Sequence, residues 1–164
     1  MHSISKIFIN ILYAIIYQSV FDTVIIMCYI LLNQKIGGCF MDKKELAVRY
    51  KHNGCNCCQA VLAAYAEELG ISLEYAKKLG SAFGAGMGGM QGNCGALIGA
   101  EMVLGLKEYN GRSVTGKSRT LFTEFAEKCK GTICIDLKGV LTGKMLCSCD
   151  NCVRNAVEAL ENVL

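Results

Sequence analysis

The chain has 164 residues, which is enough for one domain of ordinary size and too few for two independent enzymatic domains. Hydrophobic residues make up 52% of the chain and charged residues 19%, a balance that excludes a disordered polypeptide. The net charge is only +3, so no nucleic-acid partner is expected. The chain also contains 11 cysteines and 18 glycines, against 2 histidines and no tryptophan or proline.

Residues 7–32 form an apolar run that is long enough to cross a membrane as a helix. Asp22, near its middle, opposes insertion by about 2.5–3.5 kcal/mol. Two interpretations stay open: a transmembrane anchor, or an upstream extension (residues 1–40) added by a mis-assigned start before Met41. The protein is expected in the cytoplasm, and an anchor at 7–32 would tether it to the inner membrane. The distribution of lysine and arginine then predicts that the C-terminal domain stays inside.

Residues 41–164 are predicted to form the working domain, a compact all-α bundle of about five helices. Strand signals are nearly absent, and only residues 132–137 contain a few β-branched residues. The predicted helices cover residues 60–69 before Gly70, a segment capped by Ser72, residues 94–106, a segment around Phe122 that ends at Gly131, and residues 152–164.

Two nucleotide-binding motifs match literally. Residues 84–89 fit G-x-G-x-x-G, and residues 111–118 fit the P-loop pattern G-x-x-x-x-G-K-S. Both motifs need a preceding strand to place their backbone amides around phosphates, but a helical segment precedes each of them here. They are therefore interpreted as loops between helices, and P-loop nucleotide binding is the least favoured function.

The cysteines give the strongest signal. Residues 55–58 and 147–152 each contain a C-x-C and a C-x-x-C spacing, and both clusters lie at predicted helix N-termini. The helix dipole stabilises a thiolate there, and C-x-x-C brings two sulfurs within reach of one disulfide or one metal ion. Cys94 opens another predicted helix, and Cys134 is alone in its segment. Two others are interpreted as small buried hydrophobes, Cys28 and Cys129.

With these two cysteine clusters, Cys94 and Cys134, the sequence resembles the bacterial redox-active protein family named for the motif C_GCAxxG_C_C. The resemblance covers about residues 43–164, and its most specific block is C-G-A-L-I-G-A at residues 94–100. It implies a small helical fold and places residues 111–118 in a variable loop. The four characteristic cysteines that it implies are Cys57, Cys94, Cys134 and Cys149. The chain departs from the family pattern in having four more, Cys55, Cys58, Cys147 and Cys152.

The resemblance implies redox function, and two mechanisms stay open. In thiol/disulfide exchange, Cys149 or Cys57 attacks and a neighbour such as Cys152 or Cys58 resolves the intermediate. Any enzymatic activity would then be that of a thiol- or cluster-dependent oxidoreductase with a redox partner protein.

The alternative is an iron–sulfur or zinc protein without catalytic turnover. In that case the four characteristic cysteines, Cys57, Cys94, Cys134 and Cys149, would be the metal ligands. Both mechanisms predict that these four sulfurs lie within about 12 Å of one another. His52 is expected at a solvated helix end.

Overall fold

The computed structural model describes residues 42–164. The predicted span 7–32 and Cys28 lie outside the described residues. None of the helices within 42–164 is both long enough and apolar enough to cross a membrane. The domain boundary predicted at Met41 stays a prediction, because the residues before it lie outside the described part of the chain.

The all-α prediction is confirmed for residues 42–164, which contain seven α-helices, one short 3₁₀ helix and no strands. In chain order these are α2 (Lys43–His52), α3 (Cys57–Tyr65), α4 (Leu73–Gly80), the 3₁₀ helix η1 (Ser81–Phe83), α5 (Gly95–Glu108), α6 (Thr115–Cys129), α7 (Cys134–Lys138) and α8 (Cys149–Glu161). The segment 132–137, with its few β-branched residues, contains most of α7 and a single isolated bridge between Asn93 and Ile133.

Side-chain caps explain where two of the cysteine-bearing helices begin. Before α3, the side chain of Asn56 accepts a hydrogen bond from the Gln59 amide, and the Gln59 side chain accepts one from the Asn56 amide. Before α8, Ser148 accepts a hydrogen bond from the Asn151 amide at 3.2 Å. The expected cap at Ser72 is also present. These caps start α3 and α8 three residues earlier than predicted.

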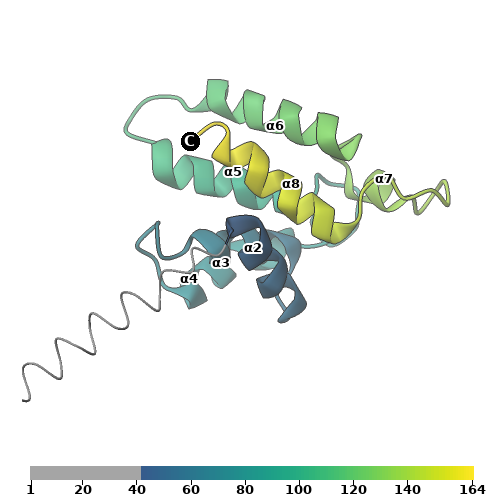
Figure 1. The fold of residues 1–164 in the computed structure, drawn as a ribbon, viewed down its shortest axis with the longest axis horizontal. Helices are drawn as coiled ribbons and strands as arrows, with labels where there is room; N and C mark the ends of the chain where they lie inside the picture. Colours follow the sequence, from purple (N-terminus) through teal and green to yellow (C-terminus); the bar gives the residue numbers. More distant parts are fainter. Residues whose placement is uncertain (1–41) are drawn as a thin grey trace, which may run out of the picture. The chain divides into compact units, whose positions relative to one another are not determined.

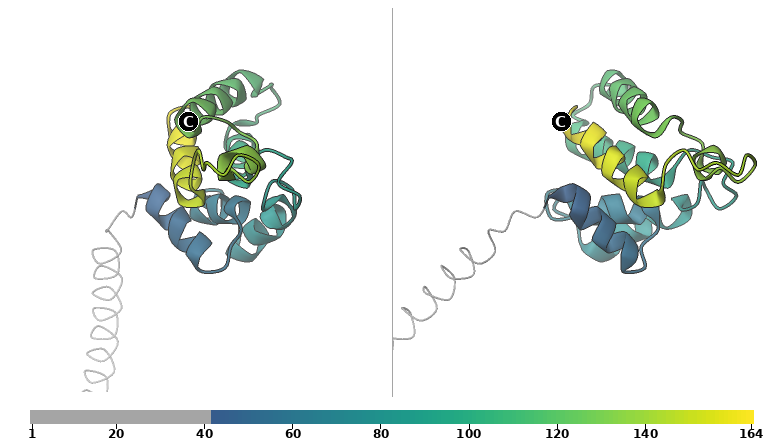
Figure 2. Two further views of the ribbon diagram at one scale, coloured as in Figure 1. Left: turned by 90° about the vertical axis from the view of Figure 1, so that its right-hand side faces the viewer. Right: turned by 45° about the vertical axis from the view of Figure 1, so that its right-hand side comes forward.

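Helix α3 packs against α2, α4 and α5, and in Figure 1 α2, α3 and α4 lie together beneath α5, α8 and α6 (see also Figure 2). Helix α8 packs against α2, α5 and α6, so the C-terminal helix closes the bundle. Close approach of α5 to α3 depends on Gly99, because a Cβ at this position would lie 2.8 Å from the Cys58 carbonyl oxygen. The core is therefore continuous and brings the start of α3 and the start of α8 to the same region.

The two literal nucleotide motifs are loops or helix ends in this fold. Neither follows a strand, because residues 42–164 contain none. Helix α6 begins inside the P-loop pattern, and Lys117 in its first turn forms an ion pair with Glu108 at 2.7 Å. The ammonium group that would face phosphates in a P-loop thus has a carboxylate partner.

Candidate functional site

A pocket of about 260 Å³ gathers five cysteines from four segments of the chain. Its walls include five cysteine thiols and two lysine ammonium groups. The cysteines are Cys55, Cys57, Cys94, Cys134 and Cys149, and the lysines are Lys51 and Lys138. The four characteristic cysteines thus line one pocket, together with Cys55.

The four characteristic cysteines all occupy the starts of helices. Cys57, Cys134 and Cys149 are the first residues of α3, α7 and α8, and Cys94 is the N-cap of α5. Unpaired amides and the positive end of the dipole at a helix start favour a thiolate over a thiol. Convergence of these helix starts therefore gives the pocket a positive character suited to thiolate chemistry.

The glycine-rich segment 84–92 forms one wall of the pocket. Ala85 and Met90, which line the pocket, have left-handed backbone conformations with φ of 49° and 60°. Gly86 also has a positive φ of 57°, and a Cβ there would lie 2.6 Å from the Cβ of Cys134. The Cys134 amide in turn donates a hydrogen bond to the Gly92 carbonyl at 3.0 Å. This segment holds Cys134 in the wall, a structural role rather than phosphate binding.

Cys57 and Cys149 are the accessible pair of sulfurs. Both are partly exposed, whereas the other seven cysteines of residues 42–164 are buried. The Cys57 thiol donates a hydrogen bond to Cys149, which lowers the pKa of Cys149 to about 5. The same contact, together with burial, raises the pKa of Cys57. At neutral pH the pocket therefore presents a thiolate in contact with a thiol.

Lys138 also supports the charge on Cys149. Its ammonium group donates to the Cys149 sulfur and to the Cys147 carbonyl oxygen, the latter at 3.0 Å. It also lies 3.8 Å from the sulfur of Cys152. Burial alone would lower the pKa of Lys138, but the neighbouring Cys152 and Cys149 sulfurs outweigh burial and raise it. Lys138 therefore stays charged beside two cysteines.

Lys51 approaches the pocket from the last turn of α2. Its ammonium group lies 2.8 Å from one oxygen of Asp150, whose other oxygen lies 2.9 Å from Nε2 of His52. Asp150 directly follows Cys149, so its negative charge would oppose the thiolate if Lys51 did not pair with it. The His52 side chain is 60% exposed, as expected at a solvated helix end, although its contact with Asp150 was not predicted.

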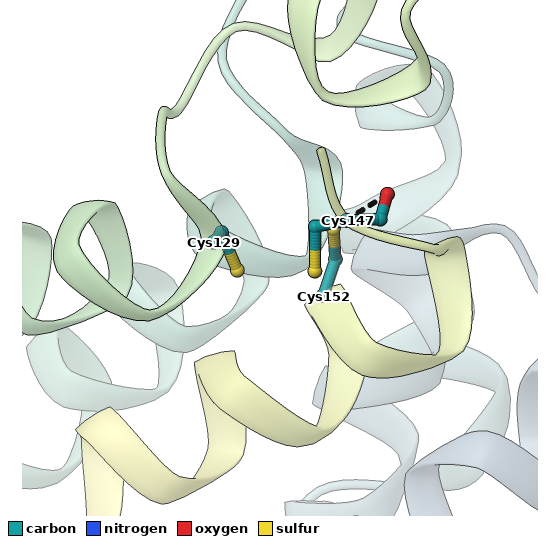
Figure 3. Close-up of side chains that lie close together, drawn as sticks. All are labelled: Cys129, Cys147 and Cys152. Atoms are coloured by element: carbon teal, nitrogen blue, oxygen red, sulfur yellow. Dashed lines mark hydrogen bonds between the residues drawn. The ribbon is translucent and has the colours of Figure 1, made fainter. Parts of the chain in front are cut away.

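A second group of sulfurs, the interior cluster, consists of Cys129, Cys147 and Cys152 (Figure 3). All three are buried, and their sulfurs lie within 4.8 Å of one another. Asn155 donates from Nδ2 to Cys129 at 3.3 Å and to Cys147 at 3.9 Å. A hydrogen bond from the Cys152 thiol lowers the pKa of Cys129 to about 6, whereas burial raises that of Cys147 to about 11.

The structure separates the two predicted resolving cysteines from the pocket. Cys152 belongs to the interior cluster and is fully buried, whereas Cys149 is partly exposed. Cys58 is fully buried with its sulfur 3.9 Å from the Met102 sulfur, and burial raises its pKa to about 12. The contact in the pocket is thus between two helix starts, Cys57 and Cys149, rather than within either C-x-x-C spacing.

The sequence alone did not assign a functional role to three residues of these sites. Cys129 is buried, as predicted for a small hydrophobe, but it belongs to the interior cluster, and no C-x-x-C spacing marks it. Cys55 lines the pocket although it has no place in the family pattern. Lys138 could have been found, because it follows Cys134 by four residues and one helical turn brings such positions to the same face.

The three sulfurs of the interior cluster lie close enough together to be candidate ligands of one soft metal ion such as zinc. Within residues 42–164, this cluster is the group of three cysteine sulfurs that lie within 4.8 Å of one another. The predicted ligand set of Cys57, Cys94, Cys134 and Cys149 is not gathered to that spacing. The candidate metal ligands and the accessible thiols are therefore different residues.

A protein-family model matches residues 55–163, and its description is "Putative redox-active protein (C_GCAxxG_C_C)". The chain belongs to this family. The match spans both cysteine clusters and every helix from α3 to α8. It confirms the family resemblance. No curated protein and no solved structure was found to match the chain.

Proposed function

We propose that this protein carries out thiol/disulfide exchange through Cys149 as the attacking thiolate and Cys57 as the resolving thiol. The observation that carries the proposal is that the two partly exposed cysteines of residues 42–164 line the same pocket, where the Cys57 thiol lowers the pKa of Cys149 to about 5. Lys138 donates to the same thiolate, and Lys51 neutralises the carboxylate beside it. Access, ionisation and a neighbouring second thiol are the three requirements of dithiol chemistry.

The chemistry consists of two balanced steps. The Cys149 thiolate attacks one sulfur of a substrate disulfide, forming a mixed disulfide and releasing one substrate thiolate. Cys57 then gives up its proton and attacks the Cys149 sulfur, which releases the second substrate thiol and leaves a Cys57–Cys149 disulfide. Two electrons pass from the protein to the substrate. A redox partner protein is the proposed natural source of the disulfide, and a small disulfide serves as its probe.

The test begins with the full chain, purified anaerobically and reduced. Oxidised glutathione is added, the reaction is quenched with acid, and the disulfides are mapped by mass spectrometry. The first intramolecular disulfide is expected between Cys57 and Cys149, and a Cys57→Ser chain is expected to stop at a Cys149–glutathione mixed disulfide. A Cys58→Ala chain, which loses a buried sulfur outside the pocket, controls for the loss of a thiol.

The same preparation tests the metal-binding alternative. An absorbance near 400 nm together with iron and sulfide would indicate a cluster, and one equivalent of zinc in a colourless protein would indicate a structural site. A colourless, metal-free protein whose Cys57–Cys149 pair forms a disulfide agrees with the proposal. If Cys57 and Cys149 do not form a disulfide even with excess oxidised glutathione, dithiol exchange in the pocket is wrong.

A further inference from the structure

The interior cluster takes its three sulfurs from three segments of the chain (Figure 3). Cys129 is the last residue of α6, Cys147 belongs to the loop before α8, and Cys152 lies in the first turn of α8. All three are buried, and their sulfurs lie within 4.8 Å of one another. None of them lines the pocket. The thiol/disulfide exchange proposed for the pocket therefore leaves this cluster without a role.

Two side chains direct N–H groups at these sulfurs. Asn155 donates from Nδ2 to the Cys129 sulfur at 3.3 Å and to the Cys147 sulfur at 3.9 Å. The ammonium group of Lys138 lies 3.8 Å from the Cys152 sulfur. A neutral thiol is only a weak acceptor, whereas a metal-bound thiolate is held and oriented by outer hydrogen bonds of this kind. Each of the three sulfurs thus has the N–H partner that suits a metal ligand.

We propose that the interior cluster is a zinc site, with Cys129, Cys147 and Cys152 as the protein ligands. A donor set made of sulfur alone selects soft ions over magnesium, calcium and manganese. Three thiolates around zinc leave one net negative charge, and Lys138 faces the cluster with a positive charge. A monovalent copper ion would leave two negative charges, and uncompensated charge in a protein interior is costly. Charge balance therefore favours zinc over copper.

A zinc ion in the interior cluster would tie an exposed loop to two helices. Residues 140–146 are all exposed, and the loop returns to the core at Cys147. There the Cys147 amide donates to the Leu137 carbonyl at 3.2 Å, and Lys138 donates to the Cys147 carbonyl at 3.0 Å. Zinc takes four ligands, so three protein sulfurs leave one position for a small ligand such as water. The ion would add bonds from the loop to the end of α6 and the start of α8.

The test uses the reduced full-length chain, freed of metal under anaerobic conditions and titrated with zinc in competition with a coloured chelator. The wild-type chain is expected to bind one zinc ion in the interior cluster. Cys147→Ser removes the least buried of the three ligands and is expected to weaken zinc binding by more than about 100-fold, because losing a ligand costs more than losing an outer hydrogen bond. Cys57→Ser, which changes the pocket, is expected to bind zinc as the wild type does.

Two asparagines of the C-terminal segment give a matched pair of variants that keep every cysteine. Asn155→Leu retains the size of the side chain but removes both hydrogen bonds to sulfur, so zinc affinity is expected to fall about 10–100-fold. Asn162 donates to Glu124 instead, and Asn162→Leu is expected to leave zinc affinity unchanged. Circular dichroism confirms that each variant is folded. Zinc is also expected to raise the urea midpoint of the wild-type chain and of Cys57→Ser, but not that of Cys147→Ser.

The zinc site does not depend on the proposed function, and the outcomes separate the two. If the metal-free wild-type chain binds no zinc at micromolar concentrations, the interior site is wrong and the pocket chemistry stands. If Cys57→Ser loses the zinc while Cys147→Ser keeps it, the ion lies in the pocket and the interior site is wrong. The zinc-loaded chain is finally treated with oxidised glutathione. It is expected to form the Cys57–Cys149 disulfide and to keep its zinc; a chain that keeps its zinc but forms no such disulfide contradicts the proposed function alone.

Discussion

The Cys149 sulfur accepts a hydrogen bond from the Cys57 thiol and another from the Lys138 ammonium group, and Lys51 adds a favourable charge. These groups act on the ionised form alone, so they lower the pKa of Cys149 from an ordinary value of 9.0 to about 5. The ionisation of Cys149 at neutral pH therefore depends on side chains from three helices, α2, α3 and α7. The dipole at the start of α8 acts in the same direction.

Alkylation of Cys149 by iodoacetamide is expected to rise with pH and to reach a plateau, with its midpoint near 5. In a Lys138→Met chain the midpoint is expected to move upward by about 1–3 units, the usual effect of losing an opposite charge in contact. The midpoint is measured by mass spectrometry of the Cys149 peptide. The rate at a single pH is a poorer measure, because thiolate nucleophilicity falls as its pKa falls.

Two comparisons make this result specific. Lys128→Met removes a lysine that pairs with Glu158, and it is expected to leave the Cys149 midpoint in place. Cys129, whose pKa is lowered to about 6 but whose side chain is fully buried, is expected to stay unlabelled until the chain is unfolded. An unchanged midpoint in Lys138→Met would show that this lysine does not stabilise the thiolate.

At the scale of elements, helix α5 offers a matched pair of glycines. A Cβ at Gly99 would press on the Cys58 carbonyl oxygen at 2.8 Å and on Val61, whereas a Cβ at Gly105 would meet nothing within 4 Å. Gly99→Ala is expected to destabilise the fold by about 1–3 kcal/mol through overpacking. Gly105→Ala is expected to stabilise it by about 0.5–1 kcal/mol, because alanine is the better helix former.

Urea unfolding of the two α5 variants gives both free energies. Opposite signs within one helix are the expected result. A Gly99→Ala chain as stable as the wild type would mean that α3 and α5 can separate at little cost, contrary to their packing in this fold.

The glycine-rich wall offers a second pair. Both Gly86 and Gly88 have positive φ, so alanine at either position carries a backbone cost of about 1–2 kcal/mol. At Gly86 the Cβ would also collide with Cys134, whereas at Gly88 it would enter open space. Gly86→Ala is therefore expected to destabilise the fold by about 1 kcal/mol more than Gly88→Ala. Equal losses of unfolding free energy would show that Cys134 gives way easily.

For the molecule as a whole, the sequence alone predicted the all-helical fold, because capping residues and apolar spacing are local signals. The N-cap at Ser72 and the helix end before Gly131 are examples, and the positions of the cysteines at helix starts follow from the same kind of signal. The pairing of Cys57 with Cys149 could not be predicted, because it depends on how α3 and α8 meet across more than 90 residues. Cys129 was misjudged for the same reason.

The buried core lies entirely within the residues that follow Met41. Every side chain of the buried core cluster belongs to residues 47–160, and these residues form one continuous set of contacts. A chain that begins at Met41 contains this whole core. It is therefore expected to unfold in urea in a single transition, with a midpoint within about 0.2 M of the full chain. A difference of that size corresponds to a few tenths of a kcal/mol for a domain of this length.

Both chains are measured in the same buffer, with circular dichroism and Cys149 alkylation as two probes of one transition. Coincident curves would show that residues 41–164 carry both the fold and the thiolate pocket. The reactivity of Cys149 is the more demanding probe, because its low pKa needs α2, α3, α7 and α8 all in place to supply Lys51, Cys57 and Lys138. A broad transition, or a Cys149 midpoint near 9 in the shortened chain, would mean that the pocket depends on residues before Met41.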